Sequence, residues 1–326
     1  MGNASKIKQI TEISLLRPIF LLIIVLYHCI CYYCEVWQPS KIITEYDICG
    51  RIAMPIGLTG FTFISGYLLY FFYKQGKYSE YKPFLINKTK RLILPFIFWG
   101  IIIQLLFKEC NLWNNPLHLW YLPMIFLCYV IGYIICPLIK KIKGEVWLII
   151  IFLTTILFQR IFNFHYIAFY FSIYFPFFIL GMSIDTFNIK KKNILIIALF
   201  SLIILIILSI LISTHKTNLI FTRGCLERLR YASCIGILIF LFKNIAIIFN
   251  DNIIQKPFWQ LLNKYSMGIY IFHHIYLSLL LKIKLYSNFM DKYIIIAPLI
   301  TFIIIISLSI LTAKLTSRIK ILQHFI

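Results

Sequence analysis

RPIFLLIIVLYHCI, residues 17–30, is apolar except for the arginine at its start and the histidine eleven positions later. The apolar run covers residues 13–34, close to the roughly 20 residues that cross the hydrocarbon core of a bilayer as a helix. Comparable runs follow at 48–73, 92–107, 119–139, 146–162, 166–184, 194–213, 231–249, 266–281 and 293–313. The sequence therefore predicts an all-α polytopic integral membrane protein with about ten transmembrane helices.

The overall composition supports a multi-pass membrane protein over a soluble one. Of 326 residues, 61% are hydrophobic and 13% are charged, and the mean hydropathy is +0.88. So little polar surface would not keep a globular domain in solution. We expect no cleavable signal peptide, because the first run lacks a small-residue cleavage site and many further spans follow it.

The net charge of +21 is distributed in a way that indicates membrane topology. If the N-terminus is cytoplasmic, roughly 20 basic residues fall in cytoplasmic segments and about 11 outside, as the positive-inside rule requires. We therefore expect both termini in the cytoplasm, and no nucleic-acid partner. The segment with Arg223, Arg228 and Arg230 is basic on the predicted outer side and departs from this pattern.

The nine cysteines form no paired C-x-x-C arrangement. Cys29, Cys31 and Cys34 cluster near the outer end of the first span, where a disulfide or a metal site is conceivable. Burial as small hydrophobic residues is the interpretation we favour, and we predict no metal site.

Arg17 and His28 share one face of the first predicted helix. Eleven residues at about 100° each return to within about 20° of the starting direction, about 16 Å further along. Taken singly, Arg17 could be an interfacial anchor and His28 a hydrogen-bonding partner of a neighbouring helix. Their joint placement favours a cavity or substrate path, because ionisable groups within a membrane are costly.

Six motifs along the chain resemble those of the membrane acyltransferase-3 family. They are Arg17-x10-His28, FTFISGYLLY (61–70), KTKRLILPFIFW (88–99), HLWYL (118–122), FPFFILGM (175–182) and YSMGIYIFHH (265–274). Members of this family transfer acyl groups to carbohydrates and other acceptors. The resemblance extends over nearly the whole chain, and it implies a single acyltransferase-3-like transmembrane domain over residues 1–326.

The resemblance implies specific site residues. An anionic acyl-coenzyme A donor, with acetyl-coenzyme A the first expectation, would bind as a co-substrate to Arg17, Lys88 and Arg91 at the cytoplasmic face. His28 would be the general base, with a transiently acylated His28 as the alternative. His273 occupies the position of the late family histidine and is the second catalytic candidate, which would orient acceptor or donor or stabilise developing charge. No permanently bound cofactor is expected.

Further residues are candidate substrate-binding groups. Tyr270 lies on nearly the same face as His273, whereas His274 is expected to point about 100° away and to serve packing. Ser65 and its neighbouring glycines are expected to permit close helix contact, with access to the reacting carbonyl as the alternative. His118 and Trp120 are expected at the outer surface, where the indole could stack on a sugar or sit in the interfacial belt.

Two departures from the family pattern affect the expected function. The third-helix element is commonly Arg-x-x-Arg, whereas Lys88 and Arg91 stand here, so one planar guanidinium is replaced by a point charge. Some members also carry an extracytoplasmic SGNH domain that completes transfer, and none is evident here. We expect direct transfer, or handover to a separate downstream transferase or glycan-assembly protein.

The resemblance implies transfer of an acyl group from acyl-coenzyme A to a hydroxyl of a carbohydrate or glycolipid, in a bacterial inner or plasma membrane. A carrier or flippase for an anionic or lipid-linked sugar is the alternative, in which the same arginine and histidine bind substrate without chemistry. The absence of a visible inverted repeat, and the presence of both histidines, favour the enzyme.

Overall fold

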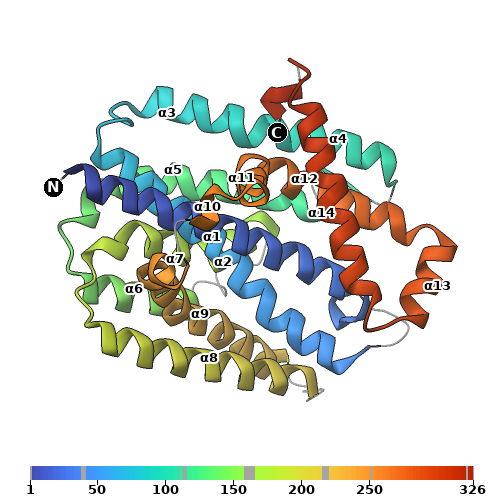
Figure 1. Cartoon of the computed structure of the whole chain (residues 1–326). Coiled ribbons are helices and arrows are strands. Elements are labelled where there is room, and N and C mark those ends of the chain that lie inside the picture. Colours follow the sequence, from blue (N-terminus) through green and yellow to red (C-terminus); the bar gives the residue numbers. More distant parts are fainter. Residues whose placement is uncertain are drawn as a thin grey trace.

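The computed structural model describes residues 2–37, 42–108, 110–112, 116–157, 166–214, 220–249, 252–320 and 322–325, and in this part of the chain it contains helices and no strand. Most long helices run side by side in one bundle (Figure 1). The α-helices are α1 (Gly2–Ile30), α2 (Thr44–Lys74), α3 (Tyr81–Lys88), α4 (Leu94–Leu106), α5 (Tyr121–Ile139), α6 (Gly144–Leu157), α7 (Tyr166–Ser183), α8 (Lys191–Thr214), α9 (Ile220–Ile248), α10 (Asn252–Gln255), α11 (Pro257–Lys264), α12 (Ser266–Leu281), α13 (Lys284–Lys292) and α14 (Ala297–Thr316).

Each of the ten predicted apolar runs overlaps one helical segment. Within the described residues, eight segments are long and apolar enough to cross a bilayer. The run at 266–281 belongs to a pair, α12 and α13, which bend by 92°. The run at 146–162 corresponds to the shorter α6, and its end lies outside the described residues. The prediction of an all-α polytopic membrane protein is confirmed.

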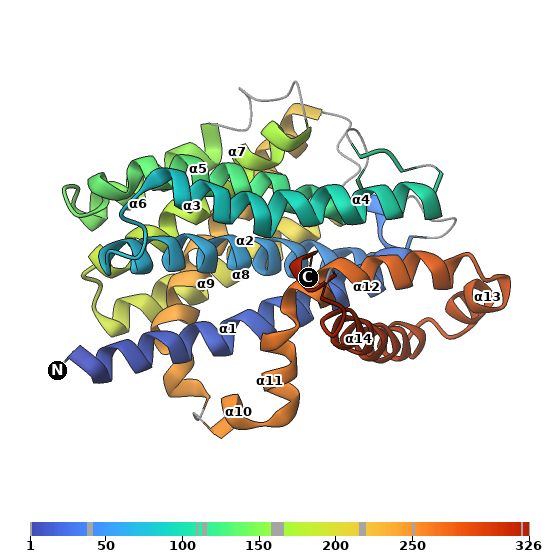
Figure 2. The same cartoon turned by 90° about the horizontal axis from the view of Figure 1, so that it is seen from above.

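Helix α1 contributes to two hydrophobic cores, because apolar residues occupy more than one face of its membrane-spanning part. Leu15, Leu16 and Phe20 belong to a core with α2, α5, α7 and α9. Leu21 and Val25 belong to a second core with α4, α12 and α14. Viewed from above, α1 lies between α2 and α9 on one side and α14 on the other (Figure 2). Arg17 and His28 therefore lie on a helix that packs against both cores.

Glycines allow α2 to approach its neighbours closely. A Cβ atom on Gly66 would lie 1.9 Å from the Phe178 carbonyl oxygen of α7, and one on Gly181 of α7 would lie 1.9 Å from the Phe63 carbonyl oxygen of α2. A Cβ on Gly60 would meet the Phe20 ring at 2.6 Å. The glycines beside Ser65 thus have the packing role expected of them.

Residues 81–106 form one long helix with a π-helical turn, η3 (Thr89–Ile93), between α3 and α4. The sequence analysis placed the basic stretch 88–91 at the entry to a span beginning near residue 92. In the structure it lies within the helix, partly in the π turn. Such turns occur frequently at functional sites, because the extra residue redirects side chains.

Segments from the early and the last parts of the chain both approach Lys88. Lys88 lines one cavity with Arg17 and another with Lys320. The Trp259 and Asn263 side chains of α11 both donate hydrogen bonds to the Ser14 carbonyl of α1, at 3.0 and 2.8 Å. That the number of crossings is even and that both termini lie in the cytoplasm stay predictions from the charge bias.

All nine cysteines are free thiols, and Cys29, Cys31 and Cys34 are buried, as predicted. Asp185 forms an ion pair with Lys74 at 2.8 Å, which joins the ends of α7 and α2 at the predicted cytoplasmic side.

Candidate active site

Four histidines meet near the middle of the bundle. His28 comes from α1, His118 from the 3-10 helix η4 (Leu117–Trp120), and His273 and His274 from α12. The His28 ring lies 5.0 Å from that of His273 and 5.1 Å from that of His274, measured between centroids. The His118 and His274 rings are stacked at 5.0 Å with an interplanar angle of 8°. Residues 245 positions apart thus form one cluster.

Backbone carbonyls define where these imidazoles carry their protons. His28 Nδ1 lies 2.9 Å from the Ile24 carbonyl oxygen, and His273 Nδ1 lies 3.0 Å from that of Ile269. A carbonyl oxygen only accepts, so both neutral rings are protonated on Nδ1. His28 Nε2 is therefore the ring nitrogen that can take up a proton. His273 Nε2 carries no proton and lies 3.3 Å from His28 Nδ1. The proton on His28 Nδ1 is therefore shared between two acceptors, the Ile24 carbonyl oxygen and His273 Nε2.

His118 carries an unsatisfied acceptor. Its Nε2 donates to the Ile271 carbonyl at 3.0 Å, which leaves Nδ1 as a lone pair that is buried and has no partner. The preceding residue, Leu117, has a φ of 51°, a strained value for a branched side chain. The ring was expected at the outer surface, but this prediction is wrong. His118 is 5% exposed, because η4 turns inward and packs on α12.

A cavity of about 170 Å³, here the histidine cavity, opens beside this cluster. Its lining includes His28, His118, His274, Tyr270 and Trp37. Tyr270 donates a hydrogen bond to the His118 carbonyl, which fixes its hydroxyl at the cavity wall. His274 was expected to face away from the site, but it lines the cavity. The reason is that His28 and His118 approach α12 from two directions, and both lie beside His274.

Trp120 lies at the border of the histidine cavity, where it stacks on Tyr170 with ring centroids 3.8 Å apart and an interplanar angle of 17°. The indole is half-buried, and Tyr170 belongs to α7. The pair forms an aromatic wall within the protein, so Trp120 is more enclosed than an interfacial belt residue.

The predicted basic residues meet in a second cavity of about 350 Å³, here the inner cavity, which is lined by Arg17, Lys88 and Arg91. Lys88 is 9% exposed, and its Nζ lies 3.5 Å from the centroid of the Tyr129 ring. No carboxylate lines this cavity. Three cations and no carboxylate among the described lining residues give the cavity wall a positive charge that suits a phosphorylated ligand.

Polar side chains occupy the region between the inner and histidine cavities. Ser65 donates to the Phe61 carbonyl at 3.0 Å, and its hydroxyl lies near those of Tyr121 and Tyr129. Tyr129 contacts Lys88 of the inner cavity, and Tyr121 lines the histidine cavity. Ser65 therefore links the two places where the predicted residues gather.

A third cavity, here the outer pocket, has a volume of about 230 Å³ and shares Tyr27, Met54 and Tyr170 with the histidine cavity. Arg51, which is 7% exposed, binds Glu35, Asp47 and Glu227 at 2.6, 2.7 and 3.0 Å. These ion pairs connect the segment after α1 with α2 and α9.

Two of the three arginines that departed from the positive-inside pattern are paired here. Arg223 binds Glu35, and Arg230 binds Glu227. The hydrogen bond from Arg223 holds the pKa of Glu35 below its usual value. The ion pairs thus offset much of the charge of this segment. The positive-inside rule counts basic residues and not net charge, so the segment still departs from the predicted topology.

Sequence analysis missed several of these residues. His274 was assigned by helical angle alone, and nothing in the order of residues placed Tyr121, Tyr129 or Arg51 at a site. Their only signal was a polar side chain within or beside an apolar run. In the described part of the chain, no group of three or more His, Cys, Asp and Glu residues is arranged to hold a metal ion.

Comparison with known proteins agrees with the geometry of the site. The family model described as an acyltransferase domain, that of the acyltransferase-3 family, matches residues 10–318. No curated protein and no solved structure matched the chain. The match includes every predicted site residue from Arg17 to His273. The chain therefore belongs to the acyltransferase-3 family and is a multi-pass membrane acyltransferase.

Proposed function

We propose that this membrane acyltransferase transfers an acyl group, acetyl in the first instance, from cytosolic acyl-coenzyme A to a hydroxyl of a carbohydrate or glycolipid. One observation carries the proposal. His28, with one ring nitrogen free to accept a proton, lines the histidine cavity between the outer pocket and an inner cavity whose cations form no ion pair within the described residues.

The donor binds from the inner side. Arg17, Lys88 and Arg91 contact its phosphates, and the absence of a lining carboxylate supports this role. The thin pantetheine arm then passes Tyr129, Ser65 and Tyr121. Arg17 and His28 are separated by about 16 Å along α1, a distance that an extended pantetheine arm can span.

His28 acts as the general base. Its Nε2 takes the proton of the acceptor hydroxyl while that oxygen attacks the thioester carbonyl carbon. The carbon–sulfur bond then breaks, the acyl group stays on the acceptor oxygen, and the thiolate of coenzyme A takes up the proton. In the alternative mechanism, the same nitrogen carries the acyl group transiently before the acceptor attacks.

His273 acts through His28. Its Nε2 accepts a hydrogen bond from His28 Nδ1, which holds the His28 ring in place and stabilises the positive charge that develops when His28 takes a proton. The Ile24 and Ile269 carbonyls keep both rings in the required tautomers.

The acceptor enters from the outer pocket. The Trp120–Tyr170 stack offers an aromatic face for a sugar ring, and the lone pair of His118 Nδ1 can accept a hydrogen bond from a sugar hydroxyl. Tyr270 holds His118 in position, and Ser65 contacts the incoming acyl arm.

The cellular setting is part of the proposal. We infer a bacterial plasma membrane, with the lipid bilayer around the helices and a glycan-assembly protein as the next user of the product.

A reconstitution assay tests the proposed function. The purified protein in proteoliposomes receives labelled acetyl-coenzyme A and a panel of glycan acceptors, and the acylated product is identified by mass spectrometry. We expect acceptor-dependent release of coenzyme A by wild type, and a loss of turnover on the order of 10²–10⁴-fold in His28→Ala. Movement of an unmodified sugar across the membrane without acyl transfer would instead establish a carrier.

A further inference from the structure

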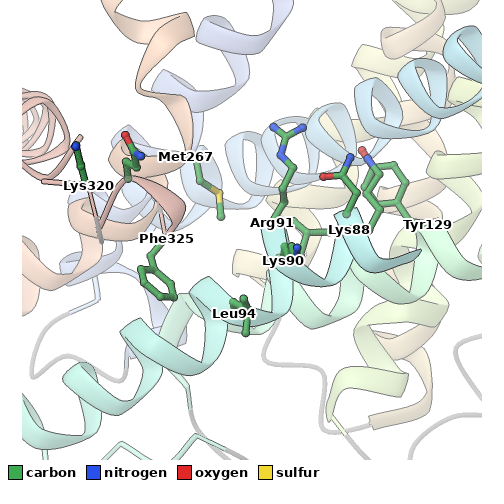
Figure 3. A pocket seen from close by; sticks show the side chains of 11 residues that line it. Lys88, Lys90, Arg91, Leu94, Tyr129, Met267, Lys320 and Phe325 are labelled. Carbon is green, nitrogen blue, oxygen red and sulfur yellow. The ribbon is translucent and has the colours of Figure 1, made fainter. Parts of the chain in front are cut away.

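A large groove lies beside the inner cavity, between the π-helical turn η3 and the end of the chain. Its volume is about 890 Å³, and we name it the C-terminal groove. Lys88, Lys90 and Arg91 line one wall, and Lys320, Gln323 and Phe325 line the other. Figure 3 shows the basic side chains on one side and the C-terminal residues facing them across the groove. Residues 319–326 lie beyond the family match, which ends at 318.

The C-terminal wall is held in place by contacts with α4. Trp99 Nε1 donates a hydrogen bond to the Phe325 carbonyl at 2.8 Å. The Phe325 ring stacks on Phe98, with centroids 4.4 Å apart and planes 17° from parallel. Because Trp99 is itself buried, the short 3-10 helix η7 (Leu322–Phe325) is anchored to the body of the protein.

The charges of this groove are not balanced by the protein. Four of its lining residues are lysine or arginine and none is acidic. In the described part of the chain, none of these four forms an ion pair, whereas Arg51, Arg223 and Arg230 at the outer pocket are all paired. Like charges gathered without counterions repel one another, and a bound anion would relieve that repulsion.

The groove continues into the donor site, because Lys88 and Arg91 line both it and the inner cavity. A ligand whose phosphates contact these two residues would place its remaining atoms in the groove. The lining also offers two side-chain amides, Asn87 and Gln323, and the aromatic ring of Phe325. Amides and an aromatic ring provide the contacts that a nucleobase requires: paired hydrogen bonds and stacking.

We propose that the C-terminal groove binds the nucleotide end of the donor, a base and a phosphorylated ribose, with Lys320, Gln323 and Phe325 as recognition residues. This rests on the proposed function, in which the donor is acyl-coenzyme A. Lys88 and Arg91 hold the diphosphate at the junction of the two cavities. The C-terminal segment therefore selects donors that carry the nucleotide over simpler thioesters.

An anionic lipid headgroup presents the same phosphate chemistry at this membrane face. The amides and the phenyl ring favour the nucleotide, since a lipid phosphate needs neither. A volume of about 890 Å³ also suits a ligand of nucleotide size.

The test compares acetyl-coenzyme A with acetyl-pantetheine, which lacks the whole 3′-phosphoadenosine 5′-diphosphate. Wild type, Lys320→Ala and Phe325→Ala in the full chain are assayed with acetyl-coenzyme A and with acetyl-pantetheine. We expect kcat/KM for acetyl-coenzyme A to fall about tenfold or more in each variant, with acetyl-pantetheine unaffected. Lys314→Ala, which removes an exposed lysine of α14 outside the groove, should behave as wild type with both donors.

Binding supplies a second readout that does not depend on turnover. Calorimetry with 3′-phosphoadenosine 5′-diphosphate in neutral detergent should show binding to wild type and weaker binding to Lys320→Ala. Three results would overturn the proposal. The first is an equal loss of kcat/KM for both donors, and the second is unchanged kinetics in both variants. The third is a loss of affinity for anionic-lipid nanodiscs without a loss of affinity for the nucleotide. If wild type uses neither donor, the proposed function fails, and the nucleotide titration alone decides what the groove binds.

Discussion

The hydrogen bond between His28 and His273 gives a graded kinetic prediction. At 3.3 Å it is longer than the usual 2.9–3.0 Å, so its contribution should lie near the lower limit for a bond to a charged group. That limit is about 1.5 kcal/mol, which corresponds to roughly a tenfold change in rate. We expect His273→Ala to lower kcat about 10–30-fold and to leave the donor KM unchanged.

A glutamine at position 273 provides the matched control. The glutamine Oε1 would occupy about the position of His273 Nε2 and accept the same hydrogen bond from His28 Nδ1. Unlike an imidazole, the amide does not take up or release a proton. His273→Gln should therefore stay within about threefold of wild type. Because His273 acts through His28, the double variant His28→Ala/His273→Ala should be no slower than His28→Ala alone.

Product formation should be followed by mass spectrometry of the acylated acceptor. A thiol reagent would be unsuitable, since the protein itself has nine free cysteines, one of them exposed. Thermal unfolding of each detergent-solubilised variant controls for misfolding, as His273 is fully buried. If both His273 variants match wild type, or if the losses of the two alanine variants multiply in the double variant, the role assigned to this bond is wrong.

Three further predictions concern the donor site, the helix packing and the outer ion pairs. Arg17→Ala should weaken acyl-coenzyme A binding by about 1.5–3 kcal/mol in titrations at low salt, Arg17→Lys should restore part of it, and Lys88→Arg should be neutral or slightly favourable. An equal loss of acyl-coenzyme A affinity in all three variants, or no loss in any of them, would contradict a phosphate contact. Gly66→Ala should lower the free energy of unfolding by about 2 kcal/mol or more, because its Cβ would meet a carbonyl oxygen at 1.9 Å, whereas Gly224→Ala, whose nearest neighbour lies at 3.8 Å, should have little effect. Glu35→Gln should lower the unfolding temperature at neutral pH by an amount equivalent to at most about 1 kcal/mol, since the carboxylate is 42% exposed. Because the pKa of Glu35 is lowered by folding, this contribution is present above the unfolded-state pKa and disappears as the pH falls through the folded-state pKa. The unfolding temperatures of wild type and Glu35→Gln should therefore converge in acid. A difference that persists in acid would refute the ion pair.

The positions of the helices could be read from the sequence because the bilayer imposes a simple rule. A helix must present about 20 apolar residues to cross the hydrocarbon, and basic residues accumulate on one side. All ten apolar runs followed from that rule. So did Arg17 and His28 as a pair, because a single helix fixes the angle between them. The spacing of glycines in α2 likewise indicated close packing, which the contact of Gly66 with α7 confirms.

Tertiary structure alone decided which residues share a cavity. The angle between His273 and His274 on α12 was correct, but it could not show that His28 and His118 approach that helix from two directions, so that both histidines reach the cluster. Similarly, no local pattern marks Lys320 and Phe325 as neighbours of Lys88. Helical periodicity determines the direction of a side chain relative to its own helix axis. Which helices become neighbours depends on packing between segments that are hundreds of residues apart, and that information is not local in the sequence.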